Sequence, residues 1–197
     1  RRGIVHRLDK DTSGLMVVAR ERSAFDALTA QIAAREVQRQ YWALAHGHWK
    51  HAADKPLRVD AAIGRDPRNR LRMAVVDIAR QAGKPSQTDV TLIGNSTSNT
   101  SPASCWVHCK LHTGRTHQIR VHMQHLGHPL LADALYGGVT AFGMQRQALH
   151  AFSLQLQHPI TLQQIQCRAS LPADMQAAIC AMGLPLPATK THAATGN

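Results

Sequence analysis

The chain has 197 residues and a mass of 21.6 kDa, enough for one hydrophobic core or two closely packed subdomains. Apolar residues make up 44% of it, which is typical of a globular protein and argues against a disordered or fibrous chain. No apolar run approaches the roughly 20 residues that span a bilayer, so we expect no membrane partner. The formal net charge is +11, from 23 basic and 12 acidic residues. This charge favours a polyanionic partner, with nucleic acid as the first hypothesis, and argues against a carboxylate-rich metal site.

The four cysteines do not form the pattern of a disulfide framework in a chain of this size. We therefore expect reduced thiols in a cytoplasmic protein. The sequence begins with Arg1 rather than methionine, so we interpret it as the downstream part of a longer protein. We expect it to be a monomer.

In the first half of the chain, apolar spacing and turn residues predict a mixture of strands and one helix. In chain order we expect a polar loop at 6–14, a strand at 15–19, a helix at 23–35 and a strand at 39–47. Ser23 followed by Asp26 resembles a capping box at the start of the helix. Residues 56–88 alternate charged and apolar side chains, which predicts short strands and basic loops, with a turn at 83–85.

In the second half, the pattern predicts a strand at 88–93, a polar exposed loop at 94–104 and a strand at 105–111. A second helix should begin near Thr116, because Ile119, His122 and Met123 then share one face, and it should end at Gly127. The tail from residue 183 has two prolines, and we expect it to be disordered.

Cys105, His108, Cys109 and His112 have a spacing that suggests a zinc site. On a strand, however, the two cysteines lie on one face and the two histidines on the other. Four ligands on opposite faces cannot surround one tetrahedral ion. We therefore expect no metal site here.

Two other patterns could carry acid–base chemistry. Histidines 112, 117 and 122 lie close together in the sequence, as in a ribonuclease that uses a histidine pair, although residue type alone is a weak signal. Asp9 lies in a basic loop that ends at Gly14, and residues 113–120 supply a turn, a helix start and further cations. A carboxylate beside a guanidinium stays ionised, as a nucleophile or base must, but the same features also fit a solvated turn and a phosphate-binding helix start.

Longer motifs decide between these alternatives. Residues 6–15 (HRLDKDTSGL) resemble the signature of RNA pseudouridine synthases of the RluA type, in which the aspartate after Arg-Leu is catalytic. Arg39-x-Tyr41-x-Ala43 resembles the family's second motif, and residues 111–123 resemble the third. Weaker blocks at 127–130, 133–137, 147–151 and 158–159 continue the match in the same order. The closest likeness is to the branch that modifies large-subunit ribosomal RNA.

The resemblance implies an α+β fold with a mixed, largely antiparallel sheet flanked by helices around a central cleft. It implies a catalytic domain over 1–182, without its N-terminal part, followed by the tail at 183–197. It also implies isomerisation of uridine to pseudouridine in structured RNA, most closely 23S ribosomal RNA, with no cofactor. Two alternatives remain open, which are a non-catalytic RNA-binding module and a synthase that acts on tRNA.

By resemblance, Asp9 is the catalytic carboxylate and Arg120 pairs with it. Tyr41 offers a ring that stacks on the uracil and a phenol near C5. A target uridine must leave its stack before Asp9 can reach the sugar, and Arg7 is placed to fill the gap. Ile119 should pack on the other face of the base. We expect further RNA contacts from the remaining candidates, which are Arg115, His117, Gln118 and Lys84.

Overall fold

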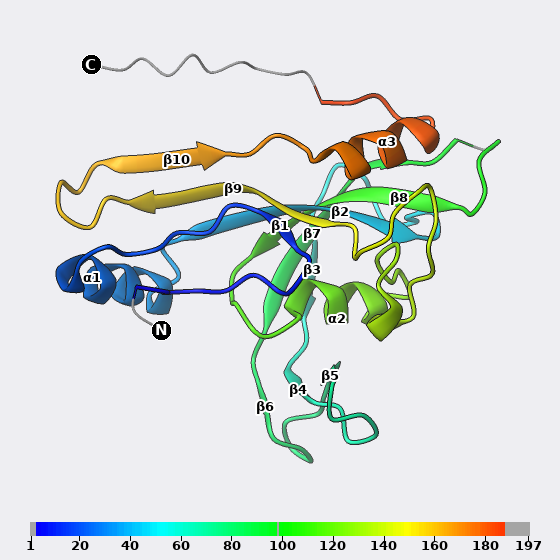
Figure 1. Ribbon diagram of the computed structural model, residues 1–197. Helices are drawn as coiled ribbons and strands as arrows, with labels where there is room; N and C mark the ends of the chain where they lie inside the picture. Colours follow the sequence, from blue (N-terminus) through cyan, green and yellow to red (C-terminus); the bar gives the residue numbers. More distant parts are fainter. Residues whose placement is uncertain (1–2, 98, 188–197) are drawn as a thin grey trace.

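The computed structural model describes residues 3–97 and 99–187, and its main feature is one large mixed sheet (Figure 1). The sheet has seven strands: β1 (Ser13–Gly14), β2 (Gln38–His46), β3 (Leu57–Asp60), β7 (Gln87–Asn95), β8 (Ser104–Leu111), β9 (Leu149–Gln157) and β10 (Gln164–Arg168). Their order is β1-β9-β2-β8-β7-β3, with β10 also paired to β9. Only the β1–β9 pairing is parallel within this sheet. The predicted mixed, largely antiparallel sheet is confirmed.

Helices lie on both faces of the sheet (Figure 1). They are α1 (Arg22–Ala33), α2 (Gln118–His125), the short 3-10 helix η1 (Ala134–Tyr136) and α3 (Ala173–Ala181). None of the helices in the described part of the chain has the length and apolar composition that a bilayer crossing requires.

Alternation along β2 distributes its side chains between two cores. Tyr41, Ala43 and Ala45 pack with Ile119 and Met123 of α2 in one buried cluster. The other face of the sheet contributes a second cluster, in which a leucine and a tryptophan of the sheet meet apolar residues of α3 (Leu44, Trp106, Met175, Ile179). Because successive strand residues point to opposite faces, β2 is held from both sides.

The predicted strands at 39–47, 88–93 and 105–111 are confirmed as β2, β7 and β8. Cys105 and Cys109 lie in the core beneath α2, whereas His108 bonds Gln40 on the opposite face of the sheet. The helix at 23–35 is confirmed as α1, but no side chain caps its start, since Asp26 accepts from Arg22 instead.

Two local predictions are wrong. Residues 15–19 form no strand, because β1 ends at Gly14 and only Val18 makes an isolated bridge, to Ile4. Residues 83–84 are the strand β6 rather than part of a turn.

The second predicted helix is confirmed as α2. It begins at Gln118 rather than at Thr116, because His117 has a left-handed backbone (φ 56°) that a right-handed helix does not include.

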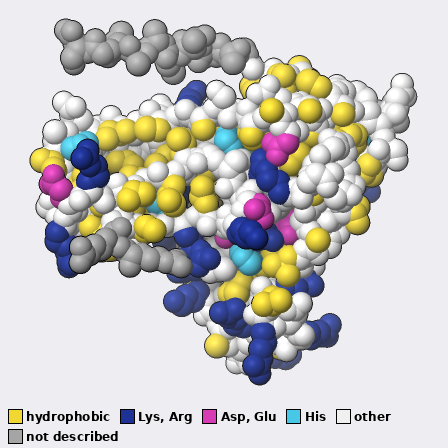
Figure 2. Space-filling model, in the orientation of Figure 1, with side chains coloured by type: hydrophobic (Ala, Val, Ile, Leu, Met, Phe, Trp, Pro, Cys, Tyr) yellow, Lys and Arg dark blue, Asp and Glu magenta, His cyan; other side chains and the backbone are white. Residues whose placement is uncertain are grey.

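Residues 61–86 form a projection, here called the basic arm, which hangs below the sheet in Figure 1. It carries a three-stranded sheet of order β5-β4-β6, made of β4 (Ile63–Arg65), β5 (Met73–Val75) and β6 (Gly83–Lys84). Six cations and two carboxylates lie in this range, and Figure 2 shows Lys and Arg side chains gathered on the projection. The expected short strands and basic loops are confirmed.

The tail expected from residue 183 is folded at its first residues. The backbone amides of Gly183 and Leu184 donate to carbonyls of α3, and Leu184 packs against the α3 core. The rest of the predicted tail, from 188 onward, lies outside the described residues.

Candidate active site

A cavity of about 570 Å³ opens between the segment that carries Asp9, the strand β2 and the start of α2. Seven residues that the sequence singled out line it, which are Arg7, Asp9, Tyr41, Arg115, His117, Gln118 and Ile119. They come from three motifs that are far apart in the chain, and the sheet brings them together. The cavity is within the size range of small-molecule sites in proteins.

Asp9 and Arg120 are in contact, as the resemblance implied. The Arg120 Nη1 lies 3.4 Å from Asp9 Oδ2, and both side chains are largely buried. The stronger partner of Arg120 is Asp133, which accepts from Nε at 2.8 Å and from Nη2 at 2.7 Å. Burial alone would lower the pKa of Arg120, but Asp133 and Asp9 together raise it. The guanidinium is therefore permanently charged and oriented by a two-bond fork, which leaves Nη1 for Asp9.

Tyr41 is 6% exposed and lines the same cavity. Burial raises the pKa of its phenol to about 12, with Arg39 opposing and Asp9 adding to the shift. At neutral pH the side chain is therefore a neutral phenol rather than a phenolate. It offers a flat ring and a hydroxyl group. It does not offer a phenolate that could act as a base toward C5 of a uracil.

His117 faces the cavity because of its left-handed backbone. Its Nδ1 lies 2.7 Å from the Tyr136 hydroxyl, which also accepts from the Met73 amide of β5 at 3.0 Å. In the tautomer with the His117 proton on Nε2, the phenol donates its proton to Nδ1. Burial lowers the pKa of His117, so the ring is neutral at pH 7.

Tyr136 connects the basic arm to the cavity. In addition to the Met73 bond, its ring lies 5.3 Å from the Arg72 guanidinium of the arm and 4.9 Å from that of Arg120. Both contacts are within the range of cation–π interactions. A single buried side chain therefore links arm residues with the arginine that contacts Asp9.

Gln118 has a different role from the expected RNA contact. Its Oε1 accepts from Thr113 and from the Arg115 amide, and its Nε2 donates to Gln87 and Thr88. These four bonds use the full capacity of the side-chain amide. Gln118 therefore fixes the 113–118 turn, which argues against the predicted RNA contact.

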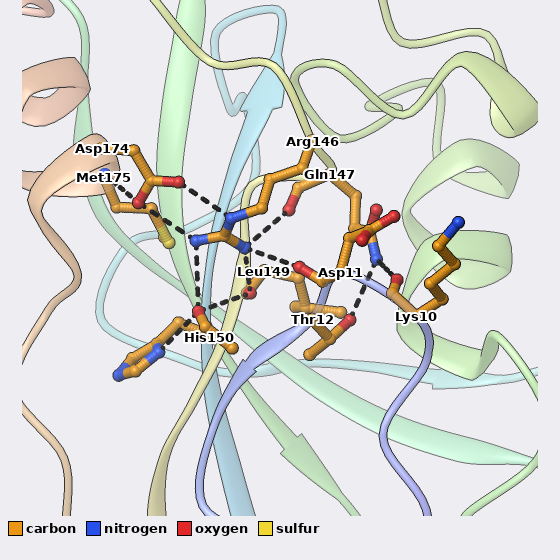
Figure 3. Close-up of polar contacts among 10 residues, drawn as sticks. Lys10, Asp11, Thr12, Arg146, Gln147, Leu149, His150, Asp174 and Met175 are labelled. Atoms are coloured by element: carbon orange, nitrogen blue, oxygen red, sulfur yellow. Dashed lines mark hydrogen bonds and ion pairs between the residues drawn. The ribbon is translucent and has the colours of Figure 1, made fainter.

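The segment that carries Asp9 is held by a side-chain network, here called the clamp (Figure 3). Arg146 forms a two-bond fork with Asp174 of α3 and donates to the Asp11 carbonyl at 2.9 Å and to Ser13 Oγ at 3.2 Å. Gln147 donates to the Lys10 carbonyl and to Thr12. The residues that directly follow Asp9 are thus tied to the start of β9 and to α3.

The other predicted contacts separate into two groups. Three of them line the cavity. Arg7 is exposed there, and Ile119 is buried in the cavity wall. Arg115 also lines the cavity, and its Nε donates to the Pro85 carbonyl. Lys84 lies on β6 of the basic arm and does not line the cavity. The structure thus brings Lys84 together with the arm cations rather than with Asp9.

The cavity is cationic. Four arginines line it, which are Arg7, Arg35, Arg39 and Arg115, and Asp9 is the only acidic side chain among its described lining residues. A family model described as RNA pseudouridylate synthase matches residues 1–125. The chain belongs to this family.

Relatives and solved structures agree with this family assignment. A protein of Xanthomonas campestris named ribosomal large subunit pseudouridine synthase D is 43% identical over 195 residues, covering 92% of this chain and 55% of the relative. One of the same name from Nitrosomonas europaea is 45% identical over 190 residues, covering 92% of this chain and 52% of the relative. The chain thus spans about half the length of the curated relatives it matches.

Two human structures of the pseudouridine synthase fold superpose on most of the chain. RNA pseudouridylate synthase domain containing 1 has a TM-score of 0.72 at 28% identity and covers 94% of this chain and 82% of that one. RNA pseudouridylate synthase domain containing 4 has a TM-score of 0.71 at 22% identity, covers 94% of this chain and 77% of its own, and shows the fold alone. The predicted fold class is confirmed.

Sequence reasoning assigned no role to several side chains that build this site. Asp133 and Tyr136 lie in the weak block at 133–137, and Gln147 lies in the block at 147–151. These blocks were therefore the available signal, but they do not indicate which partner each side chain meets. For Arg39 the signal is its place as the first residue of the second motif, which does not indicate a role.

Proposed function

We propose that this chain carries the catalytic centre of an RNA pseudouridine synthase. It isomerises uridine to pseudouridine in structured RNA, and large-subunit ribosomal RNA is the substrate class. Membership of the RNA pseudouridylate synthase family supports the reaction, and the relatives named ribosomal large subunit pseudouridine synthase D support the substrate. One observation carries the proposal, namely a single carboxylate, Asp9, in a cavity lined by arginines.

The reaction needs one carboxylate and no external reactant. The N1–C1′ bond of uridine breaks, the base turns and a C5–C1′ bond forms. C5 then loses its proton to solvent, and N1 takes up one proton from solvent, so that no atom is gained or lost overall. Hydrolytic glycosidases, which transfer the sugar to water, use a second carboxylate at a set distance. Asp9 has no such companion among the described residues that line the cavity, which favours isomerisation over hydrolysis.

Asp9 must be ionised, whether it attacks C1′ or stabilises the positive charge that develops there. Arg120 places a positive charge beside this carboxylate, since its guanidinium contacts Asp9 Oδ2 while Asp133 fixes its orientation. Tyr41 stacks on the uracil, and its neutral hydroxyl is a hydrogen-bond donor for the turning base. In the tautomer with its proton on Nε2, His117 is a second donor on the same cavity wall.

The target uridine has to leave its stack before Asp9 can reach it, at a cost of roughly a few kcal/mol. Arg7 is exposed at the cavity and carries a planar guanidinium that can stack in the vacated position. The basic arm would hold neighbouring phosphates, because its cations outnumber its carboxylates six to two. We further propose that the protein acts in the cytoplasm, and its monomeric state stays a prediction.

The test is an isomerisation assay on defined RNA. The chain is incubated with a transcript of the large-subunit RNA and, separately, with tRNA, and pseudouridine is mapped by carbodiimide modification and primer extension. We expect a modified site in the large-subunit transcript. Modification of tRNA alone would show that tRNA, rather than large-subunit RNA, is the substrate class. Tight binding with no modified site in either RNA would show that the chain is a non-catalytic RNA-binding module.

A further inference from the structure

Arg39 is a buried cation without a carboxylate. The residue is 8% exposed, yet none of its side-chain nitrogens has a hydrogen-bond or ion-pair partner among the described residues, and its Nε is fully enclosed. The equally buried Arg120 shows the usual arrangement, in which two carboxylates meet the guanidinium. Charged groups are rarely buried without a partner, because desolvation costs several kcal/mol per ion.

The side chain of Arg39 borders the cavity next to Tyr41. Both residues line it, and they lie two positions apart on the same face of β2. Gly114 lies directly against the guanidinium, and a Cβ at that position would overlap the Arg39 Nη1. The absence of a side chain at 114 thus leaves room for this guanidinium at the cavity wall.

A second unpartnered donor lies beside Arg39. His6 Nε2 accepts from the Val17 amide at 3.0 Å, so a neutral ring carries its proton on Nδ1. This Nδ1 is buried and has no partner among the described residues. Burial and the neighbouring Arg39 lower the pKa of His6 to about 4 against an opposing contact with the Arg7 backbone, which keeps the ring neutral. His6 also lines the cavity.

We propose that Arg39 and His6 form an anion site that binds a backbone phosphate of the RNA next to the flipped uridine. Two neighbouring donors that lack acceptors fit a phosphodiester, because a guanidinium and an N–H can each bond a non-bridging oxygen. The uracil oxygens are neutral and would leave the charge of Arg39 uncompensated. The site deepens the proposed function, on which it rests.

The lining of the cavity extends beyond the residues around Asp9. It also includes Ile32, Ala33 and Arg35 at the end of α1. Arg35 and Arg39 are both cations, and Asp9 is the only carboxylate among the described lining residues. A nucleotide whose uracil stacks on Tyr41 thus has its backbone close to a second cationic region.

The first experiment compares three variants of the full chain, Arg39→Met, Arg39→Lys and the control Arg22→Met. Arg22 lies exposed on α1 and pairs with Asp26 outside the cavity. Binding of a short RNA hairpin with one loop uridine is measured between about 50 and 200 mM salt. We expect Arg39→Met to weaken binding about tenfold and to reduce the salt slope by roughly 0.7, the value for one phosphate of a single strand.

Arg39→Lys should keep most of the salt slope, and Arg22→Met should keep the whole slope. Thermal unfolding provides an independent readout, because relieving an unpaired buried charge should leave Tm unchanged or raise it. A structural arginine would instead lower Tm by several degrees and leave the salt slope unchanged. That result would overturn the proposal.

A second experiment does not depend on any protein variant. The same hairpin carries a neutral methylphosphonate at the linkage 5′ or 3′ of the uridine, and its binding to the unaltered chain is measured. One of the two positions should reproduce the loss of affinity and slope seen with Arg39→Met. Unchanged binding at both positions would overturn the phosphate site, and an equal effect of Arg39→Met on phosphodiester and methylphosphonate hairpins would place Arg39 on the base instead.

These readouts are separate from catalysis. A chain that isomerises uridine but shows no Arg39 effect on the salt slope would refute the anion site and keep the proposed function. A chain that binds through Arg39 but forms no pseudouridine would refute the proposed function and keep the anion site.

Discussion

Arg120 contacts two carboxylates, and the two contacts differ in strength. Asp133 accepts from two nitrogens of the guanidinium at 2.7 and 2.8 Å, while Asp9 lies 3.4 Å from the remaining nitrogen. Asp133 is 1% exposed and is fully committed to this fork. The looser partner, Asp9, is the one that lines the cavity. Because the Asp9 contact is the longer one, Asp9 has a positive charge beside it but is not held by a two-bond ion pair.

The motifs could predict Asp9, Tyr41 and Arg120, because the family signatures mark them directly. They could not predict Asp133 as the main partner of Arg120. Nor could they predict that the side-chain amide of Gln118 forms all its hydrogen bonds within the protein. Hydrogen-bond partners depend on which loops the sheet brings together, and that information is not local. His117 shows the same limit, since its left-handed backbone is an uncommon conformation for a non-glycine residue.

The buried histidines predict how stability depends on pH. Burial lowers the pKa of His6 to about 4, and it lowers the pKa values of four further histidines, His108, His117, His122 and His150. Between about pH 4 and the unfolded value near 6.5, the unfolded chain binds more protons than the folded one. The free energy of unfolding should therefore rise with pH across this window and be fully present above it.

Urea unfolding at a series of pH values from 4.5 to 7.5 measures this dependence. The variant His6→Asn should reduce the rise, because Asn keeps an acceptor for the Val17 amide but does not titrate. A free energy of unfolding that falls as pH increases through this window would contradict the assigned burial.

At the scale of elements, local patterns could predict β2, β7, β8 and α1. Each shows an apolar periodicity over several residues that matches its burial. Local patterns do not predict β9, β10 or α3. β9 is packed on both faces and lacks clean alternation, and α3 is apolar on most sides. β1 has only two residues and exists because it pairs with His150 and Ala151 far along the chain.

The clamp predicts a defect in turnover without a defect in binding. Gln147→Met removes the donors that hold Lys10 and Thr12, while the size of the side chain is nearly kept. Misplacing Asp9 by a fraction of an ångström should lower the single-turnover rate by roughly 10- to 100-fold. RNA affinity should change little, since these contacts do not reach the cations of the cavity.

Gln176→Met provides a matched control, because Gln176 also donates to a backbone carbonyl, that of Leu171, but outside the clamp. It should leave the single-turnover rate unchanged. Equal rates for Gln147→Met and the unaltered chain would mean that the clamp does not position Asp9.

The link through Tyr136 predicts that the arm loosens when one hydroxyl is removed. Tyr136→Phe keeps the ring between Arg72 and Arg120 but leaves the Met73 amide and His117 Nδ1 without their partner. The free energy of unfolding should fall by roughly 1–3 kcal/mol. Trypsin should cleave after Arg68 and Arg70 faster than in the unaltered chain, and equal cleavage rates with equal stability would exclude the link.

At the scale of the whole molecule, the net charge of +11 is unevenly distributed, since the basic arm alone holds six cations and two carboxylates. The arm lies on the same side of the sheet as α2 in Figure 1, and Figure 2 shows Lys and Arg side chains gathered on it. Composition alone could predict a polyanionic partner. It could not predict that Lys84 belongs to the arm while Arg39 and Arg115 border the cavity, because that division follows from the path of the chain.

The arm predicts a salt-dependent share of RNA binding. Arg68 and Arg70 lie exposed between β4 and β5. Arg68→Gln with Arg70→Gln should reduce the slope of log affinity against log salt by roughly 0.7–0.9 for each phosphate that the variant no longer binds. Filter binding measures the slope, and Arg22→Gln on α1 is the control. An unchanged slope in the double variant would exclude the arm from RNA binding.

The most direct test of the account is the release of tritium from RNA labelled at uridine C5, compared between the unaltered chain and Asp9→Asn. The amide has the shape of the acid but cannot carry the charge that cleavage needs, whereas most phosphate contacts lie elsewhere. We predict release by the unaltered chain and none by Asp9→Asn, with nearly equal RNA affinity by filter binding. Near-normal release by Asp9→Asn would remove Asp9 from the reaction and contradict the account.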